Sequence, residues 1–274
     1  MAIKGNKGRL PLTRKEQIWY LLKNEVGLLF LINVTTFLFV IPLILVFFFG
    51  VSTFHHFNLD ASSTSSDFFN IFLMYGLLTV PATLLLCIGY SGLYSTIKQL
   101  VFESTSHYST YWKGIKRNIK PFFGYYLITG ATSGLLVINF GYHIYMDGDI
   151  VFKSILLGAN ILILLTLLIA QPIVLFEGVT FNNYLIAHIR NGVYLFYKGF
   201  PLSLICLLLT LLPIALILFI PINIFFIPLG MLATFYISLA GLINFIICLY
   251  TYEKVVDKEQ ISEIYHKGLE DINL

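Results

Sequence analysis

The sequence predicts an all-α polytopic membrane protein with about six transmembrane helices and both termini in the cytoplasm. The chain is 58% hydrophobic and only 11% charged, whereas a soluble domain carries about a quarter charged residues. Six apolar runs each reach about 20 residues, enough to cross about 30 Å of hydrocarbon at about 1.5 Å per residue. All Lys and Arg residues except Lys153 flank these runs from one side.

The six predicted spans follow one another without large soluble insertions. They cover residues 26–51, 69–96, 121–142, 154–176, 201–220 and 228–250. The last two are expected to form a hairpin, because Pro221 and Pro228 disfavour one continuous helix. The chain is therefore interpreted as one integral membrane domain. Residues 1–25 form a cytoplasmic tail and elbow, residues 26–250 hold the spans, and residues 251–274 form a cytoplasmic C-terminal helix. The basic N-terminus shows no short apolar region followed by a cleavage site, so no cleaved signal peptide is expected.

The distribution of charge orients the spans. The N-terminal tail, the loop between spans two and three, the loop between spans four and five, and the C-terminal tail are all basic. Lys153 is accompanied on the other side by Asp60, Asp67, Asp147 and Asp149. Basic loops stay in the cytoplasm, and the number of crossings is even. Both tails are therefore expected on the cytoplasmic side of a bacterial cytoplasmic (inner) membrane.

Residues 111–120 form a basic amphipathic segment before the third span. Ile115 and Ile119 share one helical face with an aromatic residue, and four cations occupy the other. This pattern predicts a short elbow helix in the headgroup layer, with a surface for anionic lipid or a partner. That candidate surface consists of Trp112, Lys113, Lys116, Arg117 and Lys120. Similar lead-ins occur at residues 18–24 and 186–198. Either the chain repeats an elbow-and-hairpin unit three times, or these are ordinary loops that enter a bilayer from its basic side.

Ionisable residues are absent near the middle of every predicted span. Glu177 is placed at the cytoplasmic end of the fourth span. This pattern argues against a carboxylate proton relay and against an intramembrane protease. The candidate intramembrane polar positions are Asn33, Asn139, Asn160, Gln171 and Asn244. These side chains either hydrogen-bond between helices or line a polar cavity for a sugar-like ligand.

We expect no catalytic residue, no cofactor and no metal. Cys87, Cys206 and Cys248 lie in apolar runs and lack metal-ligand spacing. His55 and His56 are adjacent, but no tight ligand spacing accompanies them. There is also no glycine-rich phosphate loop.

One segment resembles a known family. Residues 88–94 read Ile-Gly-Tyr-Ser-Gly-Leu-Tyr, and an aromatic stretch with Lys116-Arg117-Asn118-Ile119 follows. Between Gly89 and Phe123 these residues resemble the YesL-like family of bacterial multi-pass membrane proteins. The chain departs from that pattern by lacking a Pro-Ala before Leu-Tyr. The resemblance implies a setting near carbohydrate-uptake systems.

The sequence is compatible with three functions. The first is a non-enzymatic accessory or regulatory component of a carbohydrate transport system, with anionic lipid and transporter subunits as partners and no nucleic acid. The second is a permease subunit driven by a separate ATPase, whose coupling helix would lie between Glu103 and Pro121. The third is an enzyme acting on lipid or cell-wall precursors. Its charged cluster would come from Glu103, His107, Glu177, His188 and Arg190.

Overall fold

The computed structural model describes residues 10–59, 64–219, 226–256, 258–259 and 261–269. Every regular element in these residues is a helix, which confirms the all-α fold class. The helices are α1 (Arg14–Asn24), α2 (Val26–Leu59), α3 (Ser65–Glu103), α4 (Ser109–Tyr145), α5 (Ile150–Thr180), α6 (Leu185–Lys198), α7 (Leu202–Phe219), α8 (Phe226–Met231), the π-helix η2 (Leu232–Tyr236) and α9 (Ile237–Val255).

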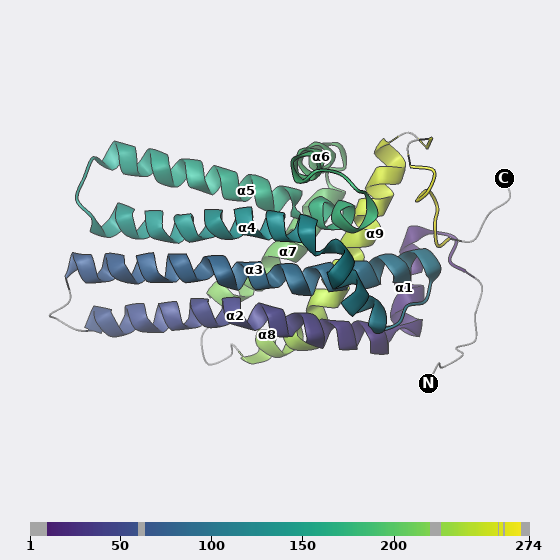
Figure 1. The fold of residues 1–274 in the computed structure, drawn as a ribbon, viewed down its shortest axis with the longest axis horizontal. Helices are drawn as coiled ribbons and strands as arrows, with labels where there is room; N and C mark the ends of the chain where they lie inside the picture. Colours follow the sequence, from purple (N-terminus) through teal and green to yellow (C-terminus); the bar gives the residue numbers. More distant parts are fainter. Residues whose placement is uncertain (1–9, 60–63, 220–225, 257, 260, 270–274) are drawn as a thin grey trace.

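Helices α2, α3, α4 and α5 lie side by side in chain order along the longest axis of the molecule (Figure 1). Each contacts its neighbours in the chain. All four are long and apolar enough to cross a bilayer. At about 1.5 Å per residue, the 39 residues of α3 extend about 58 Å, well beyond about 30 Å of hydrocarbon. Helix α3 is therefore longer than the hydrocarbon layer is thick.

Close packing of α3 against α4 depends on small residues on both helices. A Cβ atom added to Gly134 would collide with the Gly76 carbonyl oxygen, and one added to Gly114 would collide with the Ser95 side chain. Such small residues let the backbones of membrane helices approach closely, where van der Waals contact replaces the missing hydrophobic drive.

A second layer, formed by α7, η2 and α9, packs across the row of long helices. The apolar run Ile227–Val255, which joins most of α8 to η2 and α9, is long enough for a fifth span. The predicted span at residues 201–220 corresponds to α7, whose 18 residues extend about 27 Å. It follows α6 after a bend of 117°, and counting α6 and α7 as one bent span raises the number of possible crossings from five to six. The predicted turn at residues 221–228 lies largely outside the described residues. Its last part differs from the prediction, because α8 already begins at Phe226.

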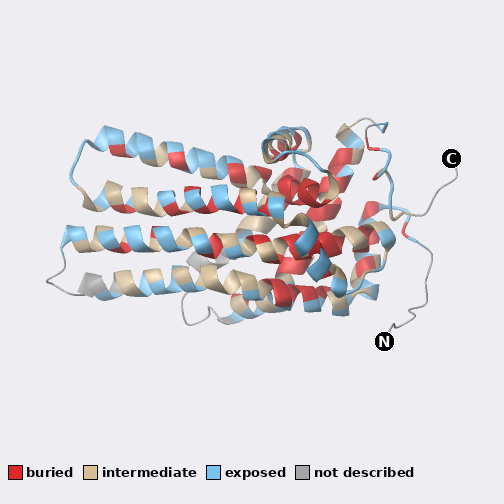
Figure 2. Cartoon of the chain, viewed as in Figure 1, coloured by how far each residue is buried: buried red, intermediate tan, exposed pale blue. Residues whose placement is uncertain are grey.

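Helix α1 and the end of α9 lie at the same end of the molecule (Figure 1). We call this the basic end, defined by α1, the turn between α3 and α4, α6 and the residues after α9. Buried residues gather there (Figure 2). The largest fully buried side chains are aromatic, and they include Tyr94, Tyr126 and Phe176. Towards the opposite end large apolar side chains stay exposed, such as Leu77 at 60% and Leu162 at 65%. Lipid tails are a suitable environment for these side chains.

Two local predictions were wrong. Residues 111–120 are not a separate elbow, because α4 continues through Pro121. A proline inside a helix removes one hydrogen bond and bends the axis without ending it, and the first turns of α4 run obliquely to the rest (Figure 1). Residues 251–274 are not one helix either. Helix α9 ends at Val255, and residues 261–268 form turns with positive φ at His266 and Gly268. Lead-ins 18–24 and 186–198 do correspond to separate helices, α1 and α6.

Candidate functional sites at the basic end

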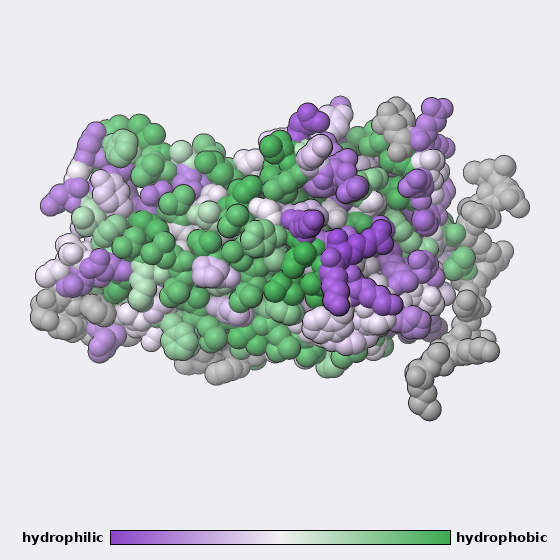
Figure 3. Space-filling view, viewed as in Figure 1, coloured by the Kyte–Doolittle hydropathy of each residue, from purple (hydrophilic) through white to green (hydrophobic). Residues whose placement is uncertain are grey.

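Four cations on the first turns of α4 form a surface that we call the basic strip. Lys113, Lys116, Arg117 and Lys120 are all exposed, and their spacing places them along one side of the helix. Figure 3 shows a hydrophilic patch over these turns, beside a hydrophobic surface. Among the described residues, the ion pairs are Arg14 with Glu253 and His188 with Glu177. None of the four cations of the strip therefore has a carboxylate partner in that part of the chain.

The helix segment that carries the strip packs closely on α3. The Tyr111 ring packs on Gly92, where an added Cβ would lie 2.8 Å from the ring, and the hydroxyl donates to the Gly89 carbonyl at 3.1 Å. Asn118 donates to the Ser95 hydroxyl at 2.8 Å. The opposite side of this helix segment is thus fixed to α3. Trp112 is 46% exposed beside the cations.

A buried group of polar side chains, which we call the Glu177 cluster, joins α5, α6 and α9. Oε2 of Glu177 lies 2.5 Å from Nδ1 of His188. Asn191 donates to Oε1 at 3.1 Å, and the Tyr252 hydroxyl donates to the same oxygen. Glu177 is 0% and His188 1% exposed. Glu177 lies near the end of the predicted fourth span, in the last turns of α5, and α6 folds back over that end and covers it.

A small cavity lies about one helical turn from this cluster, among α5, α6, α7 and α9. Its lining includes Ile173 one turn before Glu177, Cys248 and Thr251 on α9, and Ser203 and Cys206 on α7. The volume accessible to water is about 10 Å³, close to the minimum for a single water molecule. The cavity can therefore hold at most a single water molecule, and it is far too small for a sugar.

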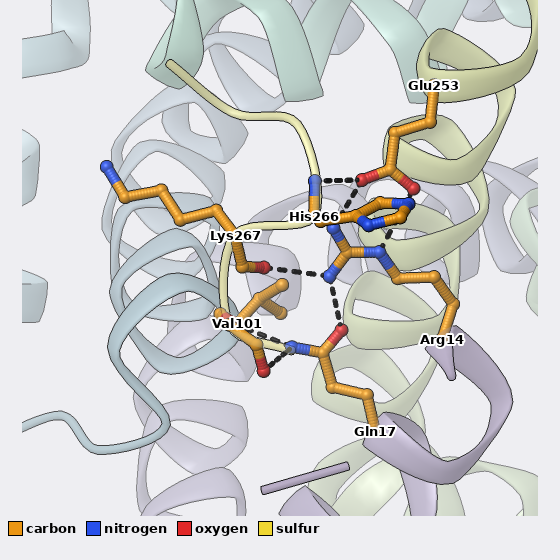
Figure 4. Close-up of polar contacts among 7 residues, drawn as sticks. Arg14, Gln17, Val101, Glu253, His266 and Lys267 are labelled. Atoms are coloured by element: carbon orange, nitrogen blue, oxygen red, sulfur yellow. Dashed lines mark hydrogen bonds and ion pairs between the residues drawn. The ribbon is translucent and has the colours of Figure 1, made fainter. Parts of the chain in front are cut away.

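A second polar network, which we call the terminal clasp, joins α1 to α9 and to the turns that follow α9 (Figure 4). The Arg14 guanidinium contacts both carboxylate oxygens of Glu253, at 2.5 and 3.2 Å, and it also donates to the Lys267 carbonyl at 2.8 Å. Gln17 accepts from Arg14 and donates to the Val101 carbonyl at 2.8 Å. The clasp joins α1, α3, α9 and the C-terminal turns, so the described residues after α9 rest on the protein itself.

The turn between α1 and α2 carries one perturbed carboxyl. Burial raises the pKa of Glu25, and the nearby His107 opposes that rise. His107 and Glu103 are exposed at the turn between α3 and α4, and Arg190 is exposed on α6. Of the five residues proposed for an interfacial charged cluster, the structure thus brings together only Glu177 and His188.

The Asn33 side chain forms hydrogen bonds with backbone groups of the π-helix and of the residue that follows its end by two positions. Its amide nitrogen donates to the carbonyls of Leu232 and Ala233, at 2.9 and 2.8 Å, and its oxygen accepts the Ser238 N–H at 2.8 Å. A π-helix shifts the register of backbone hydrogen bonds. The fully buried Asn33 side chain supplies partners at the point where that register changes.

The other predicted polar positions lie apart from Asn33. With its amide oriented to satisfy its neighbours, Asn160 accepts from the Leu136 N–H at 2.7 Å and from Asn139 at 3.2 Å, joining α5 to α4. Gln171 faces the buried Tyr126, and Asn244 lies beside Tyr94. The five predicted positions therefore do not surround one cavity.

Lys153, the cation predicted on the outer side, is buried at the opposite end of the molecule. Its ammonium donates to the carbonyls of His143 and Met146, at 3.1 and 2.7 Å. These carbonyls belong to the last turn of α4 and the residue after it, where a cation satisfies groups that lack helical partners.

Comparison of the chain with protein-family models, with curated proteins and with solved structures finds no match. The Glu177 cluster had a weak sequence signal, namely a carboxylate followed 11 and 14 residues later by His188 and Asn191. That signal identifies a contact only when α6 is known to return along α5.

Proposed function

We propose that this chain is a non-enzymatic accessory or regulatory component of a carbohydrate transport system in the cytoplasmic membrane. It would act through the basic strip, which binds anionic lipid headgroups or an acidic surface of a transporter subunit. The observation that carries the proposal is the row of four exposed cations on a segment whose other side is fixed to α3.

Electrostatics supports this use of the strip. A Lys or Arg near an anionic membrane surface contributes about 1 kcal/mol, so four such residues contribute about 4 kcal/mol. The exposed indole of Trp112 suits the same headgroup layer. The resemblance of residues 89–123 to the YesL-like family supports a carbohydrate-uptake setting.

The alternative functions have weaker support. A permease driven by a separate ATPase would present a coupling helix between Glu103 and Pro121. Here residues 104–108 connect α3 directly to α4, and α4 continues through Pro121. An enzyme acting on lipid or cell-wall precursors would need an open cleft around its charged groups, whereas Glu177 and His188 are enclosed.

The test is affinity purification from native membranes with a charge-reversed strip. Lys113→Glu with Arg117→Glu should abolish co-purification of a carbohydrate-transport subunit. Arg190→Glu with Lys198→Glu is the matched control, because it reverses two exposed cations at the same end. We expect the control to retain the subunit. Equal recovery with both variants, or no transport subunit with the unmodified chain, would contradict the proposal.

A second measurement separates the two kinds of partner. The same variants are purified in nanodiscs that contain phosphatidylglycerol or only phosphatidylcholine. Loss of retained phosphatidylglycerol in the strip variant would identify lipid as the ligand. Unchanged lipid together with loss of the subunit would identify the protein partner.

A further inference from the structure

Three cations from distant parts of the chain come together at the basic end, and we call them the cation triad. Lys98 belongs to α3, Arg117 belongs to the basic strip on α4, and Lys267 belongs to the turns after α9. Arg117 and Lys267 are both close enough to Lys98 to repel it electrostatically. The function proposed above uses Arg117 as one member of a row and assigns no role to Lys98 or Lys267.

Lys98 and Lys267 approach the same aromatic ring. The Lys98 ammonium lies 6.0 Å and the Lys267 ammonium 5.3 Å from the centroid of the Phe102 ring. A cation within about 6 Å of an aromatic ring is attracted to its face. Lys98 also donates to the Val179 carbonyl at 2.6 Å. Neither the ring nor the carbonyl carries a full negative charge, so these contacts position the two ammonium groups without neutralising them.

The terminal clasp sets the position of Lys267. The Lys267 carbonyl accepts a hydrogen bond from Arg14 at 2.8 Å, and the N–H of the preceding His266 donates to Glu253 at 2.9 Å. The next residue, Gly268, has a positive φ of 82° and packs on the backbone of α3, which leaves no room for a Cβ atom. The ammonium of Lys267 points away from Arg14 and Glu253 (Figure 4), and its side chain is exposed. The backbone around Lys267 is therefore fixed, while the charge is presented towards α3.

Arg117 is held near Lys98 by the contact between α4 and α3. Its neighbour Asn118 donates to the Ser95 hydroxyl at 2.8 Å, about one turn before Lys98 on α3. Glu263 attracts Lys98 from a distance, but among the described residues no ion pair joins its carboxylate to the triad. Three positive charges thus converge without a carboxylate in contact in that part of the chain. Like charges at close range disfavour one another's charged form, so an anion bound between them gains free energy from all three.

We propose that the cation triad binds a phosphate group, carried either by a lipid headgroup or by a soluble phosphate. The guanidinium of Arg117 can donate two parallel hydrogen bonds to phosphate oxygens, while Lys98 and Lys267 act as point charges. The exposed Trp112 on the same helix suits the headgroup layer, which favours a lipid source. The inference rests on the proposed function through Arg117, and it goes further by naming the ligand chemistry and by adding α3 and the C-terminal turns to the site.

The experiment is calorimetric titration of the full-length chain in a neutral detergent with short-chain phosphatidic acid and, separately, with inorganic phosphate. Arg117→Gln with Lys267→Gln removes two exposed members of the triad, so the fold should be kept. Each cation contributes about fivefold in affinity, so this variant should bind about 20- to 30-fold more weakly than the wild type.

The matched control is Lys113→Gln with Lys120→Gln, which removes the same charge from the basic strip and leaves the triad intact. It should bind nearly as tightly as the wild type. Equal weakening in the two variants, or a wild type that binds neither probe, would overturn the proposal. Binding of phosphatidic acid alone would identify a lipid headgroup as the source, and equally tight binding of inorganic phosphate would identify a soluble phosphate.

Proteolysis of the C-terminal turns gives a second measurement. A ligand that binds the folded state stabilises it, so phosphatidic acid should slow cleavage of these turns in the wild type but not in Lys267→Gln. Equal protection of both proteins, or protection of neither, would refute the site. Failure of the proposed function is visible separately. A wild type that binds phosphatidic acid without co-purifying a transport subunit refutes that function and keeps the triad, whereas a chain that retains its subunit and binds neither probe refutes the triad alone.

Discussion

Asn33→Leu should destabilise the protein strongly although it hardly changes the volume of the side chain. In the structure the Asn33 amide makes three hydrogen bonds to the backbone around η2, with lengths of 2.8 to 2.9 Å. Leucine fills the space but offers no donor or acceptor. Three backbone groups would lose their side-chain partner at a position where Asn33 is fully buried.

The magnitude follows from hydrogen bonds measured between membrane helices. Each contributes about 0.6 kcal/mol on average and up to about 1.7 kcal/mol. Three such bonds predict a loss of about 2 to 5 kcal/mol in the free energy of unfolding. The upper part of this range applies if the backbone groups stay unsatisfied, because each buried unpaired group costs about 1 to 3 kcal/mol.

The assay is equilibrium unfolding in mixed detergent micelles, followed by tryptophan fluorescence. Thr166→Val is the matched control, since Thr166 is exposed and its hydroxyl bonds only within its own helix, to the Leu162 carbonyl. We expect the control to change stability by less than about 1 kcal/mol. Equal unfolding midpoints for Asn33→Leu and Thr166→Val would refute the reasoning and show that η2 closes its hydrogen bonds without Asn33.

Three further predictions concern the basic end and the helix contacts. Arg14→Lys keeps the charge but loses the two-point contact with Glu253, which should lower the free energy of unfolding by about 1–3 kcal/mol. A protease should then cleave the C-terminal turns faster than in the wild type, and wild-type resistance would contradict this. Gly114→Ala should lower the free energy of unfolding by about 1–3 kcal/mol through overpacking. The control Gly158→Ala, whose added Cβ meets nothing within 4 Å, should be neutral or stabilising by up to about 1 kcal/mol. Similar changes in melting temperature for the two variants would count against the close contact at Gly114. Because burial raises the pKa of Glu25, the folded state retains a proton that the unfolded chain has released, so stability should fall as pH rises above the ordinary carboxyl range. Glu25→Gln should remove that fall, and unfolding midpoints with the same pH slope in both proteins would disprove it.

Much of the membrane-spanning architecture could be predicted because it depends on local composition. An unbroken apolar run such as residues 26–51 determines a spanning helix by its length alone. The exposed positions of Lys116 and Arg117 likewise follow from helical periodicity. The bend between α6 and α7 lay beyond such reasoning, since residues 185–198 and 202–219 each satisfy helix rules separately and only their packing fixes an angle of 117°.

The candidate sites, like the fold, could be predicted from the sequence only in part. The sequence by itself determined which residues are cationic and near the membrane surface, because charge and spacing are properties of the chain. Only the tertiary structure decided that Glu177 is enclosed, that Arg14 reaches Glu253 across 239 positions, and that Asn33 serves the backbone of a helix some 200 residues away. These contacts depend on how helices return to one another. The partner of a buried polar side chain depends on that packing, and no local sequence pattern predicts it.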